Sequence, residues 1–471
     1  MAARPKTDVP LISHLMRRAG FGATSDELEE MSSRSYEDLV EDLVHFERSP
    51  ELVEDVLSRF YPQLWANKDN PDVWNGRWFF RMINTKRPLE EKMTLFWHHV
   101  FATGWTKSEH TPTMVDHIQM LRANCLTDFS SLLVGLSRDP AMIYWLDNCE
   151  NHGGAINENY GRELPELFSM GIGNYTEHDI KAAARAFTGW TFKQPMPLYP
   201  FGHYDSMFKY DSRDHDDGVK TFLGQTGRFN GEDIIKIIVR QEATARFVSR
   251  HLYNFFVADE PQVPSWSVTP PQDPAAVEAL AKSFLDSNGD MRVVMQDLFD
   301  SDFFKQARFR KVKSPADFIA GTLKLAGTFR QVEPGLTALE PASVAMGQKL
   351  MDPPSVEGWH TGKEWIDGGT LTERVNFAVG EVGNMARPGV RLIANQIRGD
   401  GSPLPPADCV RKALELAGQL TVSDVTHQSL LDFAQTEGDL TFGSPEEAAK
   451  SERRIVRLLQ LIVASREYQF M

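Results

Sequence analysis

The sequence predicts a mainly α-helical fold: a large multi-helix body with a small β-hairpin inserted around residues 204–227. Three observations favour this fold. Helical periodicity with capping signals recurs along most of the chain, and one stretch, residues 190–227, lacks it. A composition of 41% hydrophobic and 24% charged residues is sufficient for a packed interior. Because the chain has 471 residues, we expect two or three domains or one large helical body.

Capping residues mark the expected helix boundaries. Residues 88–101 are rich in Met, Leu, Phe and Trp and hold no Gly or Pro after the first position, so they predict a helix. Thr176 and Asp179 form a capping-box pattern in front of an alanine-rich run. A cap residue stands directly before a proline at three further expected helix starts, Asp273-Pro274, Ser314-Pro315 and Ser444-Pro445. Gly289 and Gly327 are expected where two of these helices end.

Residues 190–227, which lack helical periodicity, contain the predicted hairpin. Residues 207–211 and 219–223 are expected to be two short strands that flank an acidic turn, residues 211–218. Two further irregular segments, the proline-rich residues 261–272 and residues 399–406, are expected to separate helical regions. We therefore expect three regions: an N-terminal helical region with the hairpin and the functional site (1–260), a second helical region packed on it (261–400) and C-terminal helices (401–471).

Composition argues against several classes of protein. Net charge is −15, from 50 Lys and Arg against 65 Asp and Glu, and phosphate binding needs local positive charge, so a nucleic-acid partner is not expected. No apolar run approaches the ~18 residues of a membrane span. The three cysteines form no CxxC pair, so neither a disulfide framework nor a zinc knuckle is expected.

Short motifs restrict the chemistry further. The sequence has no GxGxxG and no GK[ST] loop, so a nucleotide cofactor is not indicated. It also has no GxSxG, no HExxH and no Cys/His pairing, which argues against serine hydrolases, zincins and cysteine proteases. The first ten residues are not followed by an apolar segment of about 7–15 residues, so no secretory signal is visible and a cytoplasmic location is expected.

His98 and His99 are the first candidates for chemistry. The helix expected at 88–101 is apolar on more than one face, so His98 should be buried. A buried neutral imidazole needs partners for both ring nitrogens, and a metal ion or a carboxylate can supply one. The alternative is a core histidine bonded to a backbone carbonyl. Adjacent helical residues lie 100° apart, so at most one of the two is a ligand.

A second cluster follows Asp147 and Asn148. Residues 157–166 combine amide, carboxylate and guanidinium side chains: Asn157, Glu158, Asn159, Arg162, Glu163 and Glu166. Pro165 is disfavoured inside a helix, so we expect the helix to begin near Leu164 and residues 157–163 to form a loop. Such a loop can bind a ligand. Alternatively, its charged groups only cap and pair with one another, as Glu158 and Arg162 could.

A third cluster occupies the expected turn. It consists of His215, Asp216 and Asp217 with Gly218 and Lys220. A histidine beside carboxylates can act as a general base or bind a metal. Asp and Gly are also ordinary turn residues, and Lys220 could simply neutralise them.

Two further segments have functional and structural interpretations. Trp190, Trp359 and Trp365 could line a sugar or peptide groove, although tryptophan more often packs in a core. Arg17 and Arg18, followed by Gly20 and Gly22, could present guanidinium and amide groups to an anion. A helix end with Gly at its stop and Arg in its last turn explains the same pattern.

Seven segments occur in an order that is specific to one group of proteins. They are HLMRRAGFG (14–22), FWH (96–98), LDN (146–148), NENYGREL (157–164), TGW (188–190), HDDGVKTFLG (215–224) and DPPSVEGW (352–359). Together they cover roughly residues 11–380, and the chain resembles the bacterial domain of unknown function 1800 family. The resemblance implies no settled activity. It implies that members are often exported and are often encoded beside sulfatase-like proteins.

The chain departs from this family pattern in two ways. No leader is expected before the first motif, although the resemblance implies that members are often exported. The family commonly has a second histidine two residues after the first, whereas here His99 is followed by Val100. The second departure removes one ligand from any metal site built on alternate positions.

These observations favour an enzyme, most plausibly a metal-dependent hydrolase with a polar His/Asp/Glu/Arg pocket. The expected ligands of a divalent metal ion are His98, Glu163, His215 and Asp216. The expected catalytic residues are Asp147, Glu158, Arg162 and Lys220. The expected substrate-binding residues are Asn148, Asn157, Asn159, Trp190 and Trp359. The alternative is a non-catalytic helical scaffold that binds a sulfatase-like protein. The two hypotheses differ in whether these side chains converge within ~10 Å in one pocket.

Overall fold

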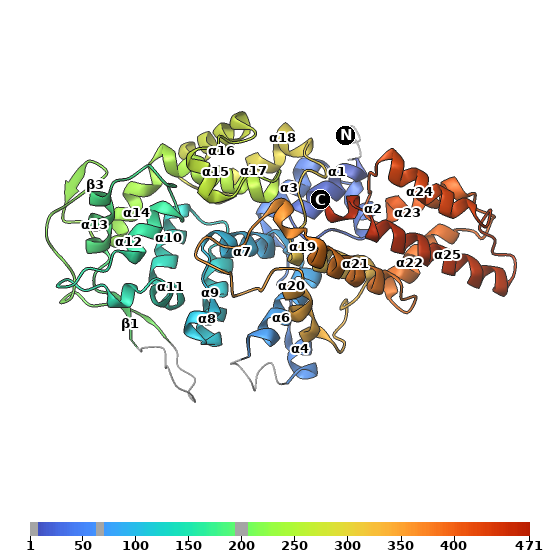
Figure 1. Ribbon diagram of the computed structural model, residues 1–471, viewed down its shortest axis with the longest axis horizontal. Helices are drawn as coiled ribbons and strands as arrows, with labels where there is room; N and C mark the ends of the chain where they lie inside the picture. The colour runs from blue at the N-terminus through green and yellow to red at the C-terminus, as the bar shows by residue number, and fades with distance from the viewer. Residues whose placement is uncertain (1–7, 63–69, 194–205) are drawn as a thin grey trace.

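The computed structural model describes residues 8–62, 70–193 and 206–471, and it confirms the predicted mainly α-helical fold. In these residues the only sheets are two antiparallel two-stranded ones. The helices form an elongated body (Figure 1). One hydrophobic core cluster extends from Ile12 to Tyr468, so helices from all parts of the chain share it. In the described part of the chain, no helix has both the length and the apolar character that a membrane crossing requires.

The centre of the body combines two distant segments of the chain (Figure 1). The N-terminal segment contains α1 (Val9–Arg18), α2 (Ser25–Ser32), α3 (Tyr36–Val44), η1 (Phe46–Arg48), α4 (Asp55–Phe60), α6 (Pro71–Asn84) and α7 (Pro88–Val100). The later segment contains α19 (Pro315–Ala326), η4 (Leu336–Ala338), α20 (Leu339–Ala345), η5 (Gly362–Trp365) and α21 (Gly368–Val382). Helix α6 packs against α19, η4 and α20, which joins the two segments.

One end of the body is formed by the middle of the chain, drawn in green in Figure 1. It contains α8 (Trp105–Ser108), α9 (Thr111–Ala123), α10 (Phe129–Arg138), α11 (Pro140–Trp145), η2 (Asn148–Glu150), α12 (Asn159–Glu166), α13 (Glu177–Ala186) and α14 (Gly231–Val239). The four strands also lie here: β1 (Trp190–Phe192), β2 (Phe208–Tyr210), β3 (Lys220–Phe222) and β4 (Gln225–Gly227). Helix α12 packs on α13, which in turn contacts β3.

The remaining helices connect this end to the centre and form the opposite end (Figure 1). The connecting group is α15 (Glu242–Phe256), η3 (Val263–Ser267), α16 (Pro274–Asp286), α17 (Met291–Asp300) and α18 (Asp302–Lys305). The opposite end is α22 (Pro388–Arg398), α23 (Pro406–Leu416), α24 (Asp424–Gln435), α25 (Pro445–Ala464) and η6 (Glu467–Gln469). Helices α15 and α16, on either side of residue 260, contact each other, and so do α21 and α25, on either side of residue 400. The domain boundaries predicted at these two positions stay predictions.

The capping signals in the sequence are confirmed. The Thr176 hydroxyl accepts from the Asp179 amide at 3.3 Å, and the Asp179 carboxylate accepts from the Thr176 amide at 2.9 Å. Ser314 forms the same reciprocal pair with Asp317 at the start of α19, whereas Asp273 and Ser444 cap α16 and α25 by accepting from the Ala276 and Glu447 amides. Gly327 ends α19 with a positive φ of 75°, a conformation that glycine adopts without strain.

Both predicted strands exist, but the pairing expected between them is wrong. β2 pairs with β1, with Phe192 opposite Phe208, and β3 pairs with β4, with Phe222 opposite Gln225. Leu223 and Gly224 both have positive φ, as a two-residue hairpin turn between β3 and β4 requires. The acidic segment between β2 and β3 therefore connects two separate hairpins.

The expected loop at residues 157–163 is also wrong, because α12 already begins at Asn159 and continues to Glu166. Pro165 is tolerated because it lies in the last turn, where its ring interrupts only the end of the helix. Its carbonyl then accepts hydrogen bonds from Met170 and Gly171, which turn the chain away. Glu163 and Glu166 consequently lie one helical turn apart on the same element.

Candidate functional site

His98 is buried as predicted, but its hydrogen bonding leaves no lone pair for a metal. The Met351 amide donates to Nε2 at 3.0 Å. Burial, and then the neighbouring His117, lower the pKa of His98 well below its ordinary value, so the ring is neutral. A neutral imidazole whose Nε2 accepts a hydrogen bond carries its proton on Nδ1. Neither nitrogen is then a free metal ligand.

Trp359 belongs to the packing around this ring. It is 4% exposed, its ring centroid lies 5.1 Å from that of His98, and it stacks on His99 at 6.3 Å. Gly358 fits beside it with a positive φ of 85°, and a Cβ there would lie 2.5 Å from the His99 carbonyl oxygen. Trp359 therefore supports the α7 core.

A histidine that is not among the candidates from the sequence does have a carboxylate partner. His117 on α9 is fully buried, and its Nδ1 lies 3.0 Å from an Asp139 oxygen. Its ring centroid is 6.2 Å from that of His98. No local motif signals this pair, because its two members lie 22 residues apart and meet only through the packing of α9 on α11.

The His215–Lys220 segment is held by its own neighbours. The Asp216 carboxylate accepts from Arg185 at 2.6 Å and from the Gly218 amide at 2.8 Å, and the first of these contacts leads in lowering its pKa to about 2. Lys220 is buried and donates to the carbonyl oxygens of Asp216 and Gly218. His215 Nδ1 lies 3.0 Å from the Thr188 carbonyl oxygen. These contacts stabilise the connection between the two hairpins.

The expected substrate-binding amides also make local contacts. Asn148 is buried and donates to the Trp190 carbonyl oxygen at 2.9 Å. Asn157 accepts from the Asn159 amide at 2.9 Å at the start of α12. Trp190 is itself 4% exposed and packs on Phe187 and Phe208.

Asp147 makes one further local contact. Its carboxylate forms an ion pair with Lys107 at 2.6 Å.

The expected metal ligands are thus distributed over separate neighbourhoods. Within residues 8–62, 70–193 and 206–471, no group of three or more His, Cys, Asp or Glu side chains is arranged to hold a metal ion. His98, Glu163, His215 and Asp216 do not form one ligand set there. The physical reason is that His98 belongs to the α7 core, whereas the other residues lie on α12 and on the connection between the hairpins.

The structure does bring together the charged residues around α12. Arg162 binds both oxygens of Glu177, at 2.9 and 2.8 Å, and lies 3.5 Å from Glu158. Its charge is therefore already matched by carboxylates. Glu163, the next residue, has no hydrogen bond or ion pair of its carboxylate with the described residues. Burial, and then the charge of Glu166, raise the pKa of Glu163 to about 7 against the opposing effect of Arg162.

Glu166 connects this carboxyl group to a cavity. The Tyr175 hydroxyl donates to the Glu166 carboxylate. Glu357, from the segment that precedes Trp359, also contributes to raising the pKa of Glu163. Carboxylates from two distant parts of the chain, Glu166 and Glu357, thus both act on Glu163, and Arg162 opposes them only in part.

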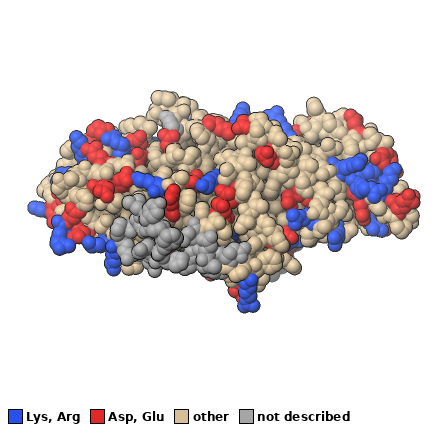
Figure 2. Space-filling view, turned by 60° about the horizontal axis from the view of Figure 1, so that its bottom comes forward, with Lys and Arg blue, Asp and Glu red and all other residues tan. Residues whose placement is uncertain are grey.

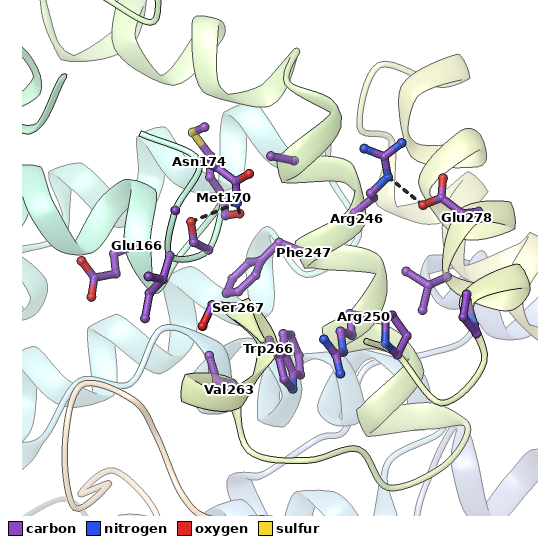
Figure 3. A pocket seen from close by; sticks show the side chains of 17 residues that line it. Glu166, Met170, Asn174, Arg246, Phe247, Arg250, Val263, Trp266, Ser267 and Glu278 are labelled. Carbon is purple, nitrogen blue, oxygen red and sulfur yellow. Dashed lines mark hydrogen bonds and ion pairs between the residues drawn. The ribbon is translucent and has the colours of Figure 1, made fainter. Parts of the chain in front are cut away.

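The cavity has a volume of about 540 Å³ and lies beside the end of α12 (Figure 3). Figure 3 shows Phe247 and Trp266 between Glu166 on one side and the Arg246–Glu278 pair on the other. Arg246 and Glu278 are 2.7 Å apart. This size and an aromatic lining with a few charged groups are typical of small-molecule sites.

Buried contacts fix the aromatic wall. The Arg250 guanidinium lies 4.6 Å from the centre of the Trp266 ring and binds Glu260 at 2.7 and 3.0 Å. Phe247 packs edge-on against Trp266, with 5.6 Å between centroids. Gly171 closes the other side: a Cβ there would lie 2.8 Å from the Phe247 ring. The wall is therefore preformed.

These wall residues are not among the candidates from the sequence, for an identifiable reason. Arg246, Phe247 and Arg250 lie on α15, and Trp266 lies in the proline-rich segment that was interpreted only as a linker. A tryptophan inside a linker, near a helix with two arginines one turn apart, was the available signal.

Comparison with known proteins gives a family and no activity. No curated protein and no solved structure matches the chain. One family described as a protein of unknown function, DUF1800, matches residues 14–470, well beyond the segments that carry the resemblance in the sequence. Because this match spans nearly the whole chain and includes both α12 and the cavity, the protein belongs to the DUF1800 family.

Proposed function

We propose that the protein is a hydrolase in which Glu163 acts as the general base. The observation that carries the proposal is a half-buried carboxyl group that has no bonded partner in the described residues, has its pKa raised to about 7 by burial and by Glu166, and lies one helical turn from a preformed cavity. A general base is most effective when its pKa is near the working pH. An ordinary surface glutamate is a much weaker base.

The cavity would bind the part of the substrate that does not react. Trp266 and Phe247 offer ring faces and edges to a sugar, an aromatic group or another flat moiety. In Figure 3 the Glu166 carboxylate is turned away from Trp266, so the reacting bond would lie at the α12 end of the cavity. Binding energy gained at the aromatic wall would then position that bond near Glu163.

Local charge favours uncharged or cationic substrates. Glu163, Glu166 and Glu357 lie together, and the nearest cation, Arg162, is already bound by Glu177. An anionic substrate would meet these carboxylates without compensation. We therefore expect neutral esters, glycosides or amides to be better substrates than phosphorylated or sulfated compounds.

The experiment is a hydrolase screen on the full chain with neutral chromogenic esters, glycosides and peptides. Activity on any of these should fall about 10²–10⁴-fold in Glu163→Gln, which preserves the shape but removes the base. Glu232→Gln removes a partly exposed carboxylate of α14, which pairs with Arg138 at 2.5 Å, and serves as the matched control. Equal activity of Glu163→Gln and the wild type on a substrate that is turned over would refute the proposed role of Glu163.

Metal dependence is a separate part of the proposal and is tested in the same screen. We propose that a divalent ion assists the reaction. Activity should then be lost on dialysis against a chelator and return on adding Mg²⁺, Mn²⁺ or Zn²⁺. Elemental analysis of the purified protein gives an independent readout.

The scaffold alternative makes the opposite predictions. A docking protein would turn over none of the compounds, and it would co-purify with a sulfatase-like partner equally well as wild type and as Glu163→Gln. Substitution of the partly exposed Asp147, Glu158 and Arg162 distinguishes the two further, because a docking protein would lose affinity for its partner, whereas an enzyme would lose turnover.

A further inference from the structure

A second cavity lies in the centre of the molecule, far along the chain from α12. It has a volume of about 50 Å³ and is enclosed by α1, α19, the turn after α23 and the C-terminal segment. A cavity of this size has room for about three to five water molecules. Arg17, Lys313 and Lys324 line it, together with Ser13, Gly22 and Gly418 and with one carboxylate, the buried Asp317.

The cations around this cavity are only partly matched by carboxylates. Lys92 pairs with Asp317, Lys311 with Asp259 at 3.1 Å and Lys324 with Glu27 at 3.9 Å. Four other buried cations in this central region have no carboxylate of the described residues within ion-pair distance: Arg17, Arg18, Lys313 and Arg374.

These four groups bind neutral oxygens instead. Arg17 donates to the Ser13 hydroxyl at 2.7 Å and to the Gly418 carbonyl oxygen at 2.5 Å. Lys313 donates to the Tyr468 carbonyl oxygen at 2.7 Å. Arg18 and Arg374 each donate to one backbone carbonyl oxygen, at 3.0 and 2.9 Å. None of these acceptors carries a compensating negative charge.

Several donors in the cluster have no acceptor at all in the described structure. They are Arg17 Nε, Arg18 Nε and Nη1, and Arg374 Nε. Burial, and then neighbouring cations, lower the pKa of Lys313 to about 7 and that of Arg17 to about 10. A buried charge without a counter-ion is costly, and buried charges in folded proteins are normally paired. The cations of the C-terminal helices in Figure 2 differ from these buried cations, because they are exposed and acidic side chains lie among them.

We propose that this cavity binds a small tetrahedral oxyanion such as phosphate, held by Arg17 and Lys313. Guanidinium and ammonium donors are the usual ligands of such an ion, and a dianion would neutralise the two unmatched cations that line the cavity. Arg18 and Arg374 do not line the cavity, but their charges act on Arg17 and Lys313 respectively and add to the positive potential. The bound ion would also tie α1 and α19 to the C-terminal segment.

The test is thermal unfolding and calorimetric titration of the full chain with inorganic phosphate at up to 10 mM, with sodium chloride at matched ionic strength. We expect saturable binding and a rise in Tm of about 2 °C or more over chloride, because a ligand that binds only the folded state stabilises it. Phosphate also stabilises proteins non-specifically by exclusion from their surface, so the variants below define the specific part.

Lys313→Met removes one unmatched charge and keeps the length of the side chain. We expect its Tm in chloride to equal or exceed that of the wild type and its specific phosphate response to disappear. Arg17→Gln is the second variant, and Lys236→Met on the surface of α14 is the control that keeps the full response. Equal phosphate responses in the wild type and in both cavity variants, or no saturable binding to the wild type, would overturn the proposal.

Discussion

Glu91 and Glu163 are two glutamates in different regions of the molecule, and their environments shift their pKa values in opposite directions. Glu91 on α7 is fully buried, yet it accepts from Trp78 at 2.9 Å, from Arg81 at 2.8 Å and from Arg122 at 2.9 and 3.0 Å. Burial alone would raise its pKa, but Arg122 and Arg81 outweigh burial and the pKa is lowered. Glu163 is less buried, has carboxylates for neighbours, and has a raised pKa.

The charged neighbours of these carboxylates, and not the extent of their burial, therefore decide the direction of the pKa shift. At neutral pH Glu91 is a charge held by cations and serves the structure. Glu163 is poised to gain or lose a proton near pH 7, which is a property of functional sites. The variants below test this contrast, beginning with the largest expected effect.

Glu91→Gln should lower the free energy of unfolding by about 3–5 kcal/mol, because it leaves the buried Arg122 without a carboxylate and Arg81 with Glu54 alone. Urea denaturation at pH 7 measures this. A decrease of less than about 1 kcal/mol would mean that the contacts of Glu91 with Trp78, Arg81 and Arg122 do not stabilise the fold.

Glu163→Gln should do the opposite and raise the free energy of unfolding by about 1 kcal/mol at pH 8, a figure reduced for the partial exposure of the side chain. The sign follows from the pKa, which is about 7 in the folded protein and close to the ordinary 4.5 in the unfolded chain. Below pH 4.5 Glu163 is protonated in both the folded and the unfolded state, so it does not lower the free energy of unfolding. As the pH rises through 7 the folded protein loses this proton, and the buried charge then lowers the free energy of unfolding. Denaturation at pH 4 should therefore show no gain, and a gain of equal size at both pH values would contradict this explanation.

Glu166→Gln should lower the pKa of Glu163, because it removes the nearest like charge. We expect the midpoint of the pH dependence of kcat/KM to move about half a pH unit towards acid. An NMR titration of the Glu163 carboxyl gives the same quantity without a substrate. An unchanged midpoint would assign the raised pKa to burial and Glu357, without Glu166.

Arg162→Gln should have the smallest effect on stability, since Arg162 and Glu177 form a largely exposed ion pair. We expect Tm to change by about 1 °C or less in calorimetry. A decrease of several degrees would show that this pair, like the Glu91 network, is structural.

Local signals predicted the helices well and the contacts poorly. Thr176, Ser314 and Ser444 mark helix starts that the structure confirms, because a cap depends on residues within one turn. The pairing of β2 with β1 could not be deduced, because it depends on which strands the helices bring together. Pro165 misled the expectation for α12, because its position in the last turn depends on where the helix begins.

The candidate site was predictable in part. The sequence singled out Glu163 and Arg162 by their density of charge, but it could not show that Glu177 would occupy the arginine and leave the glutamate free. Phe247 and Trp266 were not recognised, because the cavity exists only where α15 and the linker pack together beside α12.

The amino-acid order alone determined the helical class, the family, the capped helix ends and the burial of His98, since each depends on periodicity or on near neighbours in the chain. The tertiary structure alone decided which charges are neutralised. Electrostatic energy depends on distances of a few ångströms between side chains that lie tens or hundreds of residues apart, and only packing sets those distances. Arg122 therefore matches Glu91, whereas Glu163 and Lys313 are left without a counter-ion.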